Sequence, residues 1–269
     1  MITTSVIPRR IIHKLRSRNL PPLEKAALAS MMALNPSFEH VHFDETEMEQ
    51  FVDREFPEYR PVMDAFALRI QRYDFFRYLA VYRLGGFYFD LDVFLNRGLD
   101  DLCDSGCVFT FEELTLSRFL RDEHHIDWEI GNYAFGAAAG HPFIRAIIDN
   151  CVRAQSDSDW ASRMLSDIPL IFRDGFNVLF STGPGLVTRT LAENAGRARS
   201  VKVLFPPDVR DESSWHKFGD YGVHLMASSW RGRDGILKRR AKAIWERTRR
   251  RACAAESFKL GPSRSMPGT

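Results

Sequence analysis

The sequence predicts an α/β protein in which helices flank a mostly parallel sheet. Short apolar segments rich in β-branched and aromatic residues alternate with longer segments of helical periodicity, a pattern typical of layered α/β folds. Of the 269 residues, 45% are hydrophobic and 27% are charged, which is the composition of an ordinary globular protein. This length is enough for one large α/β domain or two small ones.

The expected elements follow one another along the chain. Strands are predicted around residues 11–12 and over residues 38–43, 87–95, 107–111, 132–138 and 201–205. Helices are predicted over residues 23–35, 44–56, 65–84 and 141–154. Asp44 is the expected N-cap of the second helix, and Gly85-Gly86 end the segment 65–84, which we expect to be the longest helix. We expect one domain over residues 1–235 and a basic C-terminal helix with a frayed tail over residues 236–269.

Composition and charge narrow the possible locations and partners. A formal net charge of +2 gives no overall signature of nucleic-acid binding, so we expect no nucleic-acid partner. The sequence contains neither a signal-peptide pattern nor about 20 consecutive apolar residues, so we expect a cytoplasmic location. Cys103 and Cys107 could ligate zinc, but no second Cys/His pair at metal spacing accompanies them. Reduced thiols are therefore the preferred interpretation.

Asp90 and Asp92 form the first candidate site. They lie two residues apart in the apolar segment 87–95, and alternate side chains of a strand point to the same side. Phe89, Leu91 and Val93 should then face the opposite way into packing. Two like charges in an apolar strand need a neutralising partner, and a divalent cation provides one. Magnesium and manganese accept oxygen ligands and are commonly shared between carboxylates and substrate phosphates.

Asp74 and Arg77 form a second pair on the helix that precedes this strand. Their spacing of three residues places both side chains on one helical face. An intrahelical salt bridge would explain the pair by itself. Their position immediately before Gly85-Gly86 and the Asp-x-Asp strand favours a functional role instead.

The segment YDFFRYLAVYRLGGFYFDLDV, residues 73–93, resembles the signature of the family 32 glycosyltransferases. That family contains the yeast-type α-1,6-mannosyltransferases and many bacterial capsule or lipopolysaccharide enzymes. The segment is also similar to the corresponding stretch of the clostridial glucosylating toxins. Four shorter segments occur in the family's order, IPRRIIH, IGNYAFGAAAGHPF, STGPGL and HLMASSW, so the resemblance covers most of the chain from Ile7 to Trp230.

The resemblance implies a GT-A fold with a Rossmann-like, mostly parallel sheet. It also implies a retaining, metal-dependent transfer from a UDP- or GDP-sugar to a glycan or lipid-linked acceptor, with Mn²⁺ or Mg²⁺ as cofactor. Surface polysaccharide synthesis is the expected context. The family usually has Trp shortly after its IIH segment, where this sequence has Leu15 and Arg16, so the resemblance does not assign the nucleotide.

The resemblance also assigns residues by position. Asp92 would ligate the metal directly, and Asp90 would contact the donor and reach the metal through water. Asp74 and Arg77 would bind hydroxyl groups of the transferred sugar. These four residues are the expected catalytic set.

Three further positions complete the expected site. Asn132 matches a polar position near the sugar or the acceptor. His224 is the candidate for a late histidine that completes the metal shell. Ser229 and Trp230 match a segment that closes over the diphosphate and should contact the donor.

One alternative function stays open at this point. The strand FYFDLDV also fits the first motif of the haloacid-dehalogenase-type phosphatases, with Asp90 as nucleophile and Asp92 as general acid. The late position of the motif and the absence of a clear acidic motif after it count against this alternative.

The segment from Lys238 to Arg251 is strongly basic, with eight Lys/Arg and a single acid, Glu246. Apolar or small residues recur at helical spacing over residues 237–248, namely Leu237, Ala241, Ile244, Trp245 and Thr248. A basic amphipathic helix of this kind can lie on an anionic membrane surface, which would place the protein at the inner membrane face. A solvated terminal helix is the other interpretation.

Overall fold

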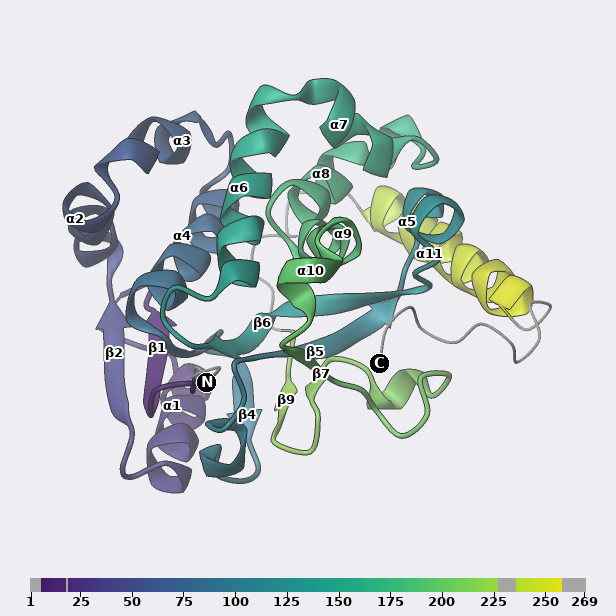
Figure 1. Cartoon of the computed structure of the whole chain (residues 1–269). Helices are drawn as coiled ribbons and strands as arrows, with labels where there is room; N and C mark the ends of the chain where they lie inside the picture. Colours follow the sequence, from purple (N-terminus) through teal and green to yellow (C-terminus); the bar gives the residue numbers. More distant parts are fainter. Residues whose placement is uncertain (1–5, 18, 227–235, 258–269) are drawn as a thin grey trace.

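The computed structural model describes residues 6–17, 19–226 and 236–257, with side chains described over residues 240–251 of the last helix. A six-stranded sheet crosses the molecule in the order β2-β1-β3-β6-β5-β7 (Figure 1). Its strands are β1 (Arg10–Lys14), β2 (Glu39–Phe43), β3 (Gly86–Phe89), β5 (Cys107–Leu114), β6 (Trp128–Ala137) and β7 (Val201–Leu204). Three of its five pairings are parallel, and β6 runs antiparallel to both neighbours. The sheet is thus mostly parallel, as predicted.

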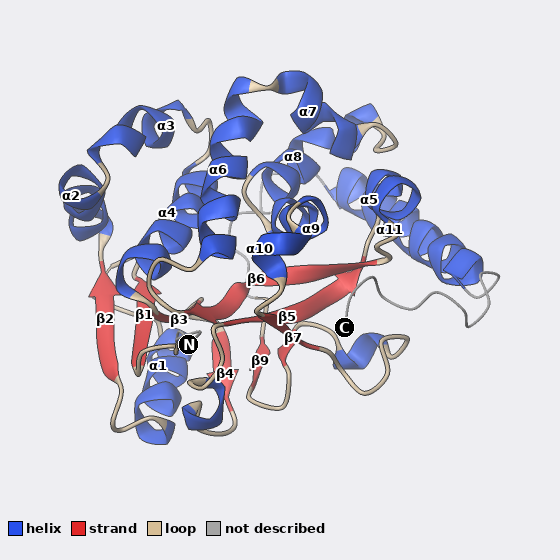
Figure 2. Ribbon diagram, in the orientation of Figure 1, coloured by secondary structure: helices blue, strands red, loops and turns tan. Residues whose placement is uncertain are grey.

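Helices cover both faces of this sheet, as Figure 2 shows. In chain order they are α1 (Pro22–Leu34), α2 (Glu45–Glu55), α3 (Arg60–Ala65), α4 (Arg69–Leu84), α5 (Arg118–His124), α6 (Pro142–Ser156), α7 (Ser158–Ser162), α8 (Arg173–Ser181), α9 (Pro184–Glu193), α10 (Ala195–Ala198) and α11 (Ile236–Ser257). Helices α4, α6 and α9 lie on one face, and α1 lies on the other. The flanked sheet confirms the predicted α/β class.

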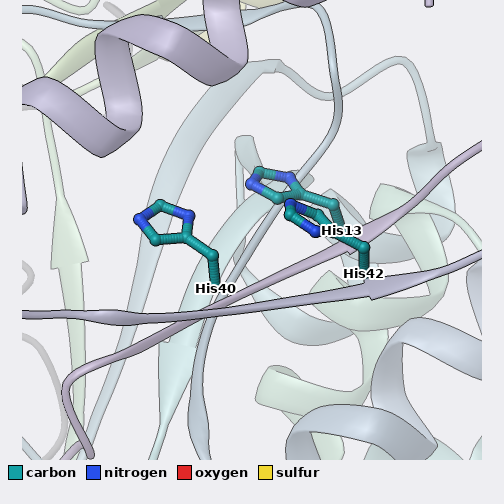
Figure 3. Close-up of side chains that lie close together, drawn as sticks. All are labelled: His13, His40 and His42. Carbon is teal, nitrogen blue, oxygen red and sulfur yellow. The ribbon is translucent and has the colours of Figure 1, made fainter. Parts of the chain in front are cut away.

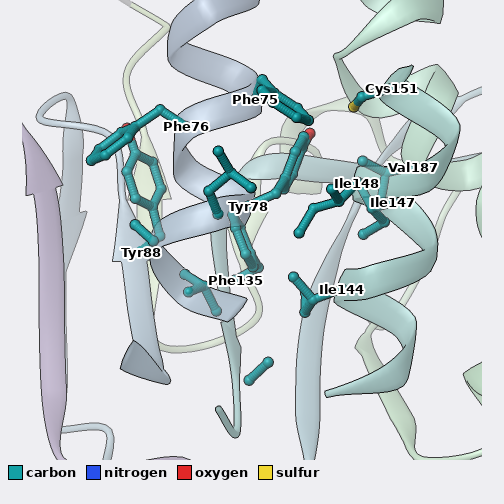
Figure 4. Packing of buried hydrophobic residues seen from close by; sticks show 14 of the residues in the cluster. Phe75, Phe76, Tyr78, Tyr88, Phe135, Ile144, Ile147, Ile148, Cys151 and Val187 are labelled. Carbon is teal, nitrogen blue, oxygen red and sulfur yellow. The ribbon is translucent and has the colours of Figure 1, made fainter. Parts of the chain in front are cut away.

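The main core lies between the sheet and helices α4 and α6. Tyr78 of α4 points toward Phe135 of β6, with ring centroids 5.8 Å apart, and Ile144 of α6 approaches from the other side (Figure 4). The rings of Phe109 and Phe135 stack with centroids 4.9 Å apart. Because this core clamps α4 against the strands, the polar face of α4 is held at the carboxyl end of β3.

Helix α2 begins as the sequence predicts. The Asp44 side chain accepts from the backbone N–H of Glu47, and the Glu47 carboxylate accepts from the backbone N–H of Asp44. This reciprocal pair is a capping box, which satisfies two N–H groups that the first helical turn leaves without partners.

The predicted helix 65–84 is divided in the structure. Helix α3 ends at Ala65, Phe66 adopts an extended backbone, and α4 begins at Arg69. The expectation that 65–84 is the longest helix is also wrong, because α11 has 22 residues and α4 has 16. Gly85 ends α4 as predicted, at φ 63°. A Cβ at Gly85 would lie 2.8 Å from the backbone nitrogen of Ala139, so the turn requires glycine.

The predicted single strand 87–95 is also divided. Strand β3 ends at Phe89, and Asp90, Leu91 and Asp92 form a turn that the Val93 N–H closes by donating to the Asp90 carbonyl at 3.1 Å. Strand β4 (Val93–Leu95) then joins β9 (Gly222–His224) and β8 (Lys217–Phe218) in a separate antiparallel sheet. The chain leaves the large sheet at the two carboxylates. Phe89, Leu91 and Val93 are nevertheless buried, as expected.

Helix α11 packs on the body of the protein, and among its described side chains Trp245 is the member of the predicted apolar stripe that makes this contact. Trp245 lies with its ring centroid 5.7 Å from Phe172 and 5.6 Å from Phe176. Arg249 pairs with Asp167, and Arg250 pairs with Glu113. Of the predicted apolar stripe, Trp245 is part-buried, whereas Ala241, Ile244 and Thr248 are exposed. Aromatic side chains on the body of the protein therefore select the packed face, which sequence periodicity alone did not identify.

Two further sequence predictions can be compared with the fold. Cys103 and Cys107 are free and buried in separate hydrophobic clusters, which agrees with reduced thiols. Among the helices in the described part of the chain, none has both the length and the apolar character needed to span a bilayer.

Candidate active site

A cavity of about 360 Å³ opens where β3 ends and the Asp90–Asp92 turn begins. Its walls come from α4, the turn, β6, β9, the last turns of α8 and the first residue of α9. Among the lining residues are six of the predicted site residues, Asp74, Arg77, Asp90, Asp92, Asn132 and His224. The tertiary structure therefore gathers these residues around one cavity of a size suited to a small ligand.

The turn presents Asp90 and Asp92 at the edge of this cavity. The Asp90 backbone N–H donates to the Tyr133 carbonyl at 2.8 Å, and the Asp92 carbonyl accepts from the Leu225 N–H at 2.9 Å. These bonds attach the turn to β6 on one side and to the segment after β9 on the other. The Asp90 and Asp92 side chains keep 28% and 17% of their surface exposed, so both carboxylates remain accessible to a ligand.

Arg77 joins the turn to helix α4. One guanidinium nitrogen, Nη1, donates to Asp90 Oδ2 at 3.2 Å and to the Asn132 carbonyl at 2.7 Å. The other, Nη2, lies 2.9 Å from Asp74 Oδ1. Burial opposes the charge on Arg77, but Asp90 and Asp74 raise the pKa of its guanidinium, which stays charged. The predicted pair Asp74–Arg77 is therefore more than an exposed intrahelical salt bridge, because Arg77 also orients Asp90.

Asp74 is enclosed by hydrogen-bond donors. Thr182 Oγ1 donates to Asp74 Oδ2 at 3.0 Å, and Asn132 Nδ2 donates to Asp74 Oδ1 at 3.2 Å. Burial raises the pKa of Asp74 to about 6, although the nearby Arg77 charge lowers it. A buried carboxylate with a raised pKa and fixed partners is typical of a functional site.

Asp90 has a raised pKa for a related reason. Burial raises it, the charge of Arg77 lowers it, and the neighbouring Asp92 raises it. Tyr88 donates its hydroxyl to Asp90 Oδ1 at 3.2 Å. Two carboxylates with this local repulsion favour the approach of a cation.

His224 reaches the two carboxylates from strand β9. Its Nε2 atom lies 3.3 Å from Asp92 Oδ1, and its ring stacks on Tyr133 with centroids 4.2 Å apart. One carboxylate oxygen of Asp90, one of Asp92 and one ring nitrogen of His224 all lie within 4.8 Å of one another. Two carboxylate oxygens and one imidazole nitrogen form a donor set that fits a divalent cation.

Several residues of the site were not predicted. Thr182 and Tyr88 hydrogen-bond to the carboxylates, and Tyr133 supports His224. Lys14 lines the cavity, lies over the ring of Tyr73 and pairs with a carboxylate of α2. Thr182 belongs to the segment STGPGL, one of the four short segments of the resemblance, but nothing in the sequence singled out its hydroxyl. Ser229 and Trp230 lie outside the described residues.

Comparison with known proteins agrees with this geometry. Residues 21–109 match the profile of a family described as a glycosyltransferase sugar-binding region containing a DXD motif. The matched region includes Asp74, Arg77, Asp90 and Asp92. Asn132 and His224 lie beyond it.

Fungal relatives extend the similarity over more of the chain. The inositol phosphoceramide mannosyltransferase 3 of Schizosaccharomyces pombe is 28% identical over 250 residues, which cover 84% of this chain and 61% of the relative. A mannosyl phosphorylinositol ceramide synthase of Saccharomyces cerevisiae is 22% identical over 226 residues, covering 78% and 53% respectively. The chain thus spans less than two thirds of the length of these relatives.

Two solved structures show similarity at lower levels. The PaToxG glycosyltransferase has a TM-score of 0.49 at 15% identity and covers 71% of each chain. The UDP-bound glycosyltransferase domain of the YGT toxin has a TM-score of 0.43 at 11% identity, covering 74% of this chain and 80% of the toxin domain. In these sequence comparisons, residues 21–109 are similar to a DXD-containing sugar-binding region of glycosyltransferases, and most of the chain is similar to fungal mannosyltransferases.

Proposed function

We propose that the chain transfers a hexose from a nucleotide-sugar donor in a reaction that requires a divalent cation and retains the anomeric configuration. The observation that carries the proposal is the meeting of Asp90, Asp92 and His224 at the edge of a cavity whose wall holds the buried pair Asp74–Arg77. One half of the site suits a metal-bound diphosphate, and the other suits sugar hydroxyls.

Asp90, Asp92 and His224 would hold the cation. Glycosyltransferases with a DXD motif generally use a divalent metal, and the single imidazole in this set favours Mn²⁺ over Mg²⁺, which strongly prefers oxygen ligands. A bound cation would neutralise the negative charge that develops on the leaving diphosphate. Arg77 orients Asp90 and favours its ionised form, and Tyr133 keeps the His224 ring facing Asp92.

Asp74, Arg77 and Asn132 would bind the transferred sugar. The Asp74 and Arg77 side chains are only 6% and 4% exposed, yet both line the cavity. Thr182 holds the Asp74 carboxylate in one orientation. Buried charged groups that are already oriented can recognise hydroxyls without a further ordering cost.

The proposed reaction needs no covalent enzyme intermediate. The bond between the anomeric carbon and the diphosphate oxygen breaks, the acceptor oxygen forms the new bond on the same face, and the acceptor proton passes to the diphosphate. The chain's own residues then act by orienting the donor and stabilising charge.

The acceptor class follows from the relatives and from helix α11. The relatives' names specify transfer of mannose to inositol phosphoceramide lipids, so we propose mannose and a lipid-linked or glycan acceptor for this chain.

Helix α11 has an exposed face formed by Arg240, Ile244, Arg247 and Arg251, with Ile244 68% exposed. This face, which we call the basic face, would bring the protein to an anionic membrane surface. A role in surface polysaccharide synthesis, on the cytoplasmic side of the membrane, stays a prediction.

A donor panel tests the proposal. UDP- and GDP-hexoses are incubated with the protein in the presence of Mn²⁺ or a chelator, and release of the nucleoside diphosphate and the anomeric form of the product are measured. We expect GDP-mannose or a related donor to be consumed only with the metal. Metal-independent turnover would contradict the proposed site, and phosphate release from a phosphate ester through a phosphoaspartate at Asp90 would favour the phosphatase alternative.

A further inference from the structure

Three histidines meet on the sheet away from the DXD cavity. His13 lies on β1, and His40 and His42 lie on the neighbouring strand β2. The parallel register places His13 opposite His42, and His40 and His42 share one face because they are two residues apart. The three rings stand on the same side of the two strands (Figure 3). Ile11, on the same face of β1 as His13, packs with Met31 of α1, so this is the face that α1 covers.

The ring geometry brings the nitrogens close together. His13 and His42 have ring centroids 5.6 Å apart, and His40 lies 6.5 Å from His13 and 6.3 Å from His42. One nitrogen from each ring lies within 4.8 Å of the other two. In a tetrahedral zinc site with Zn–N bonds of about 2.05 Å, ligand nitrogens lie about 3.3 Å apart, so small side-chain rotations would complete the geometry.

His13 has the hydrogen bond expected of a metal ligand. Its Nδ1 atom lies 3.0 Å from the Phe89 carbonyl oxygen, which can only accept, so Nδ1 carries the proton. Nε2 is therefore left with its lone pair, and this atom is buried with no hydrogen-bond partner. His13 itself is fully buried. A histidine that donates one ring N–H to a carbonyl and turns the other nitrogen to a buried site matches the usual arrangement of histidine ligands.

The protonation states agree with this arrangement. Burial, together with the neighbouring His42 and His40, lowers the pKa of His13 to about 3, although its hydrogen bond to the Phe89 carbonyl opposes this shift. Burial also lowers the pKa of His40. Both shifts favour neutral imidazole, which is the form that binds metals.

We propose that His13, His40 and His42 bind a zinc-type divalent ion at a second metal site, separate from the DXD cavity. Three imidazoles suit Zn²⁺, Ni²⁺ or Cu²⁺, whereas Mg²⁺ and Mn²⁺ prefer oxygen ligands. Three protein ligands leave a fourth tetrahedral position for water. His40 and His42 are only part-buried, which gives the ion a path to the buried His13.

The site would stabilise the part of the sheet that supports the active site. Strand β2 lies at the edge of the six-stranded sheet, and an ion shared by β1 and β2 would hold it there. His13 also holds the carbonyl of Phe89, the residue immediately before Asp90. The ion would thus have a structural role, stabilising the strands that support the DXD turn. This inference does not depend on the proposed transferase activity.

Zinc binding to the full chain tests the proposal. The DXD site is first disabled by substitution, so that it does not bind zinc itself. In an Asp92→Asn/His224→Gln background, we expect one zinc ion per chain in competition with a chromogenic chelator, and a higher Tm in zinc. In the same background His13→Asn retains an N–H that can donate to the Phe89 carbonyl but removes the ligand. His13→Asn and His40→Ala should each weaken zinc binding by more than about 100-fold, because even loss of an outer-shell partner costs 10–100-fold.

Two controls make the result decisive. His124→Gln removes an imidazole elsewhere and should leave zinc affinity unchanged. If the His13→Asn variant does not fold, the double variant His40→Ala/His42→Ala is used in its place, because these two residues are only part-buried. Absence of zinc binding in the background, or equal zinc affinity with and without the three histidines, would overturn the proposal.

Discussion

The Nε2 atom of His224 lies 3.3 Å from the Oδ1 atom of Asp92. The two residues are distant in sequence and meet because β9 pairs with β4, in a register that sets His224 opposite Val93. The smaller, three-stranded sheet therefore positions His224, the third residue of the candidate metal site. This dependence explains why the site needs both the DXD turn and the late part of the chain.

Asp92→Asn should abolish transfer while the Tm stays close to that of the wild type. The substitution removes a charged ligand from a part-exposed position, so metal-dependent donor binding is lost without a cavity in the core. Turnover and calorimetric donor binding in Mn²⁺ measure the effect. Asp104→Asn, at an exposed aspartate, is the control and should behave as the wild type. Normal turnover in Asp92→Asn would contradict the assignment.

His224→Gln should raise the Mn²⁺ concentration for half-maximal activity by about tenfold or more. Tyr133→Leu should act in the same direction but more weakly, since it removes the ring on which His224 stacks. Tyr133→Phe keeps that ring and serves as the control. Manganese titrations of the rate distinguish these variants. If the manganese titration of His224→Gln is the same as that of the wild type, His224 is not a metal ligand and has only a structural role.

Arg77→Lys should lower kcat/KM by the equivalent of about 2–5 kcal/mol, the usual cost of disrupting a buried charge pair. Lysine cannot reproduce the planar fork that contacts Asp74, Asp90 and the Asn132 carbonyl together. Arg83→Lys is a matched control on the same helix, because Arg83 pairs with Glu55 at an exposed position. Equal kinetics for the two variants would show that Arg77 has no role beyond the helix surface.

Asp74 should make the stability of the protein depend on pH. Its pKa is about 6 in the folded protein against an ordinary value of 3.8, so its ionisation disfavours the folded state. The stabilising contribution is present below about pH 4 and is lost as pH rises through about 6. The free energy of unfolding of Asp74→Asn, relative to the wild type, should therefore rise by about 3 kcal/mol between about pH 4 and 7.

Urea denaturation of Asp74→Asn and the wild type across this range measures the difference directly. The variant should have no transferase activity at any pH, whereas wild-type activity should fall as pH drops below about 6. A pH-independent stability difference would show that the Asp74 pKa is not raised.

Two sets of substitutions separate the roles of helix α11. Arg240→Gln/Arg247→Gln/Arg251→Gln should weaken binding to anionic vesicles by up to about 3 kcal/mol and leave the Tm unchanged. Trp245→Ala should lower the Tm, because it uncovers Phe172 and Phe176, and should leave vesicle binding unchanged in the folded protein. Vesicle co-sedimentation at low salt gives the first result. If the wild type does not sediment, the basic face has no membrane role.

Much of the candidate site could be predicted because its parts are close in sequence. Asp74 and Arg77 share a helical face, and Asp90 and Asp92 follow a buried strand that Gly85-Gly86 joins to that helix. Spacings of a few residues depend on local backbone geometry, which the sequence shows directly. Thr182 could not be identified in this way, because its contact with Asp74 depends on how α8 packs against α4.

By itself, the sequence determined the α/β class, most of the strands and helices in the first half of the chain, and the identity of the DXD carboxylates. Capping residues, glycine turns and apolar periodicity act over one or two turns of chain, so they do not need the rest of the protein. Only the tertiary structure decided that Asp90 and Asp92 lie in a turn, that Trp245 faces the body of the protein, and that His13 meets His42. Each of these depends on pairing or packing between distant segments, whose free energy arises from buried surface and strand registers that no local pattern records.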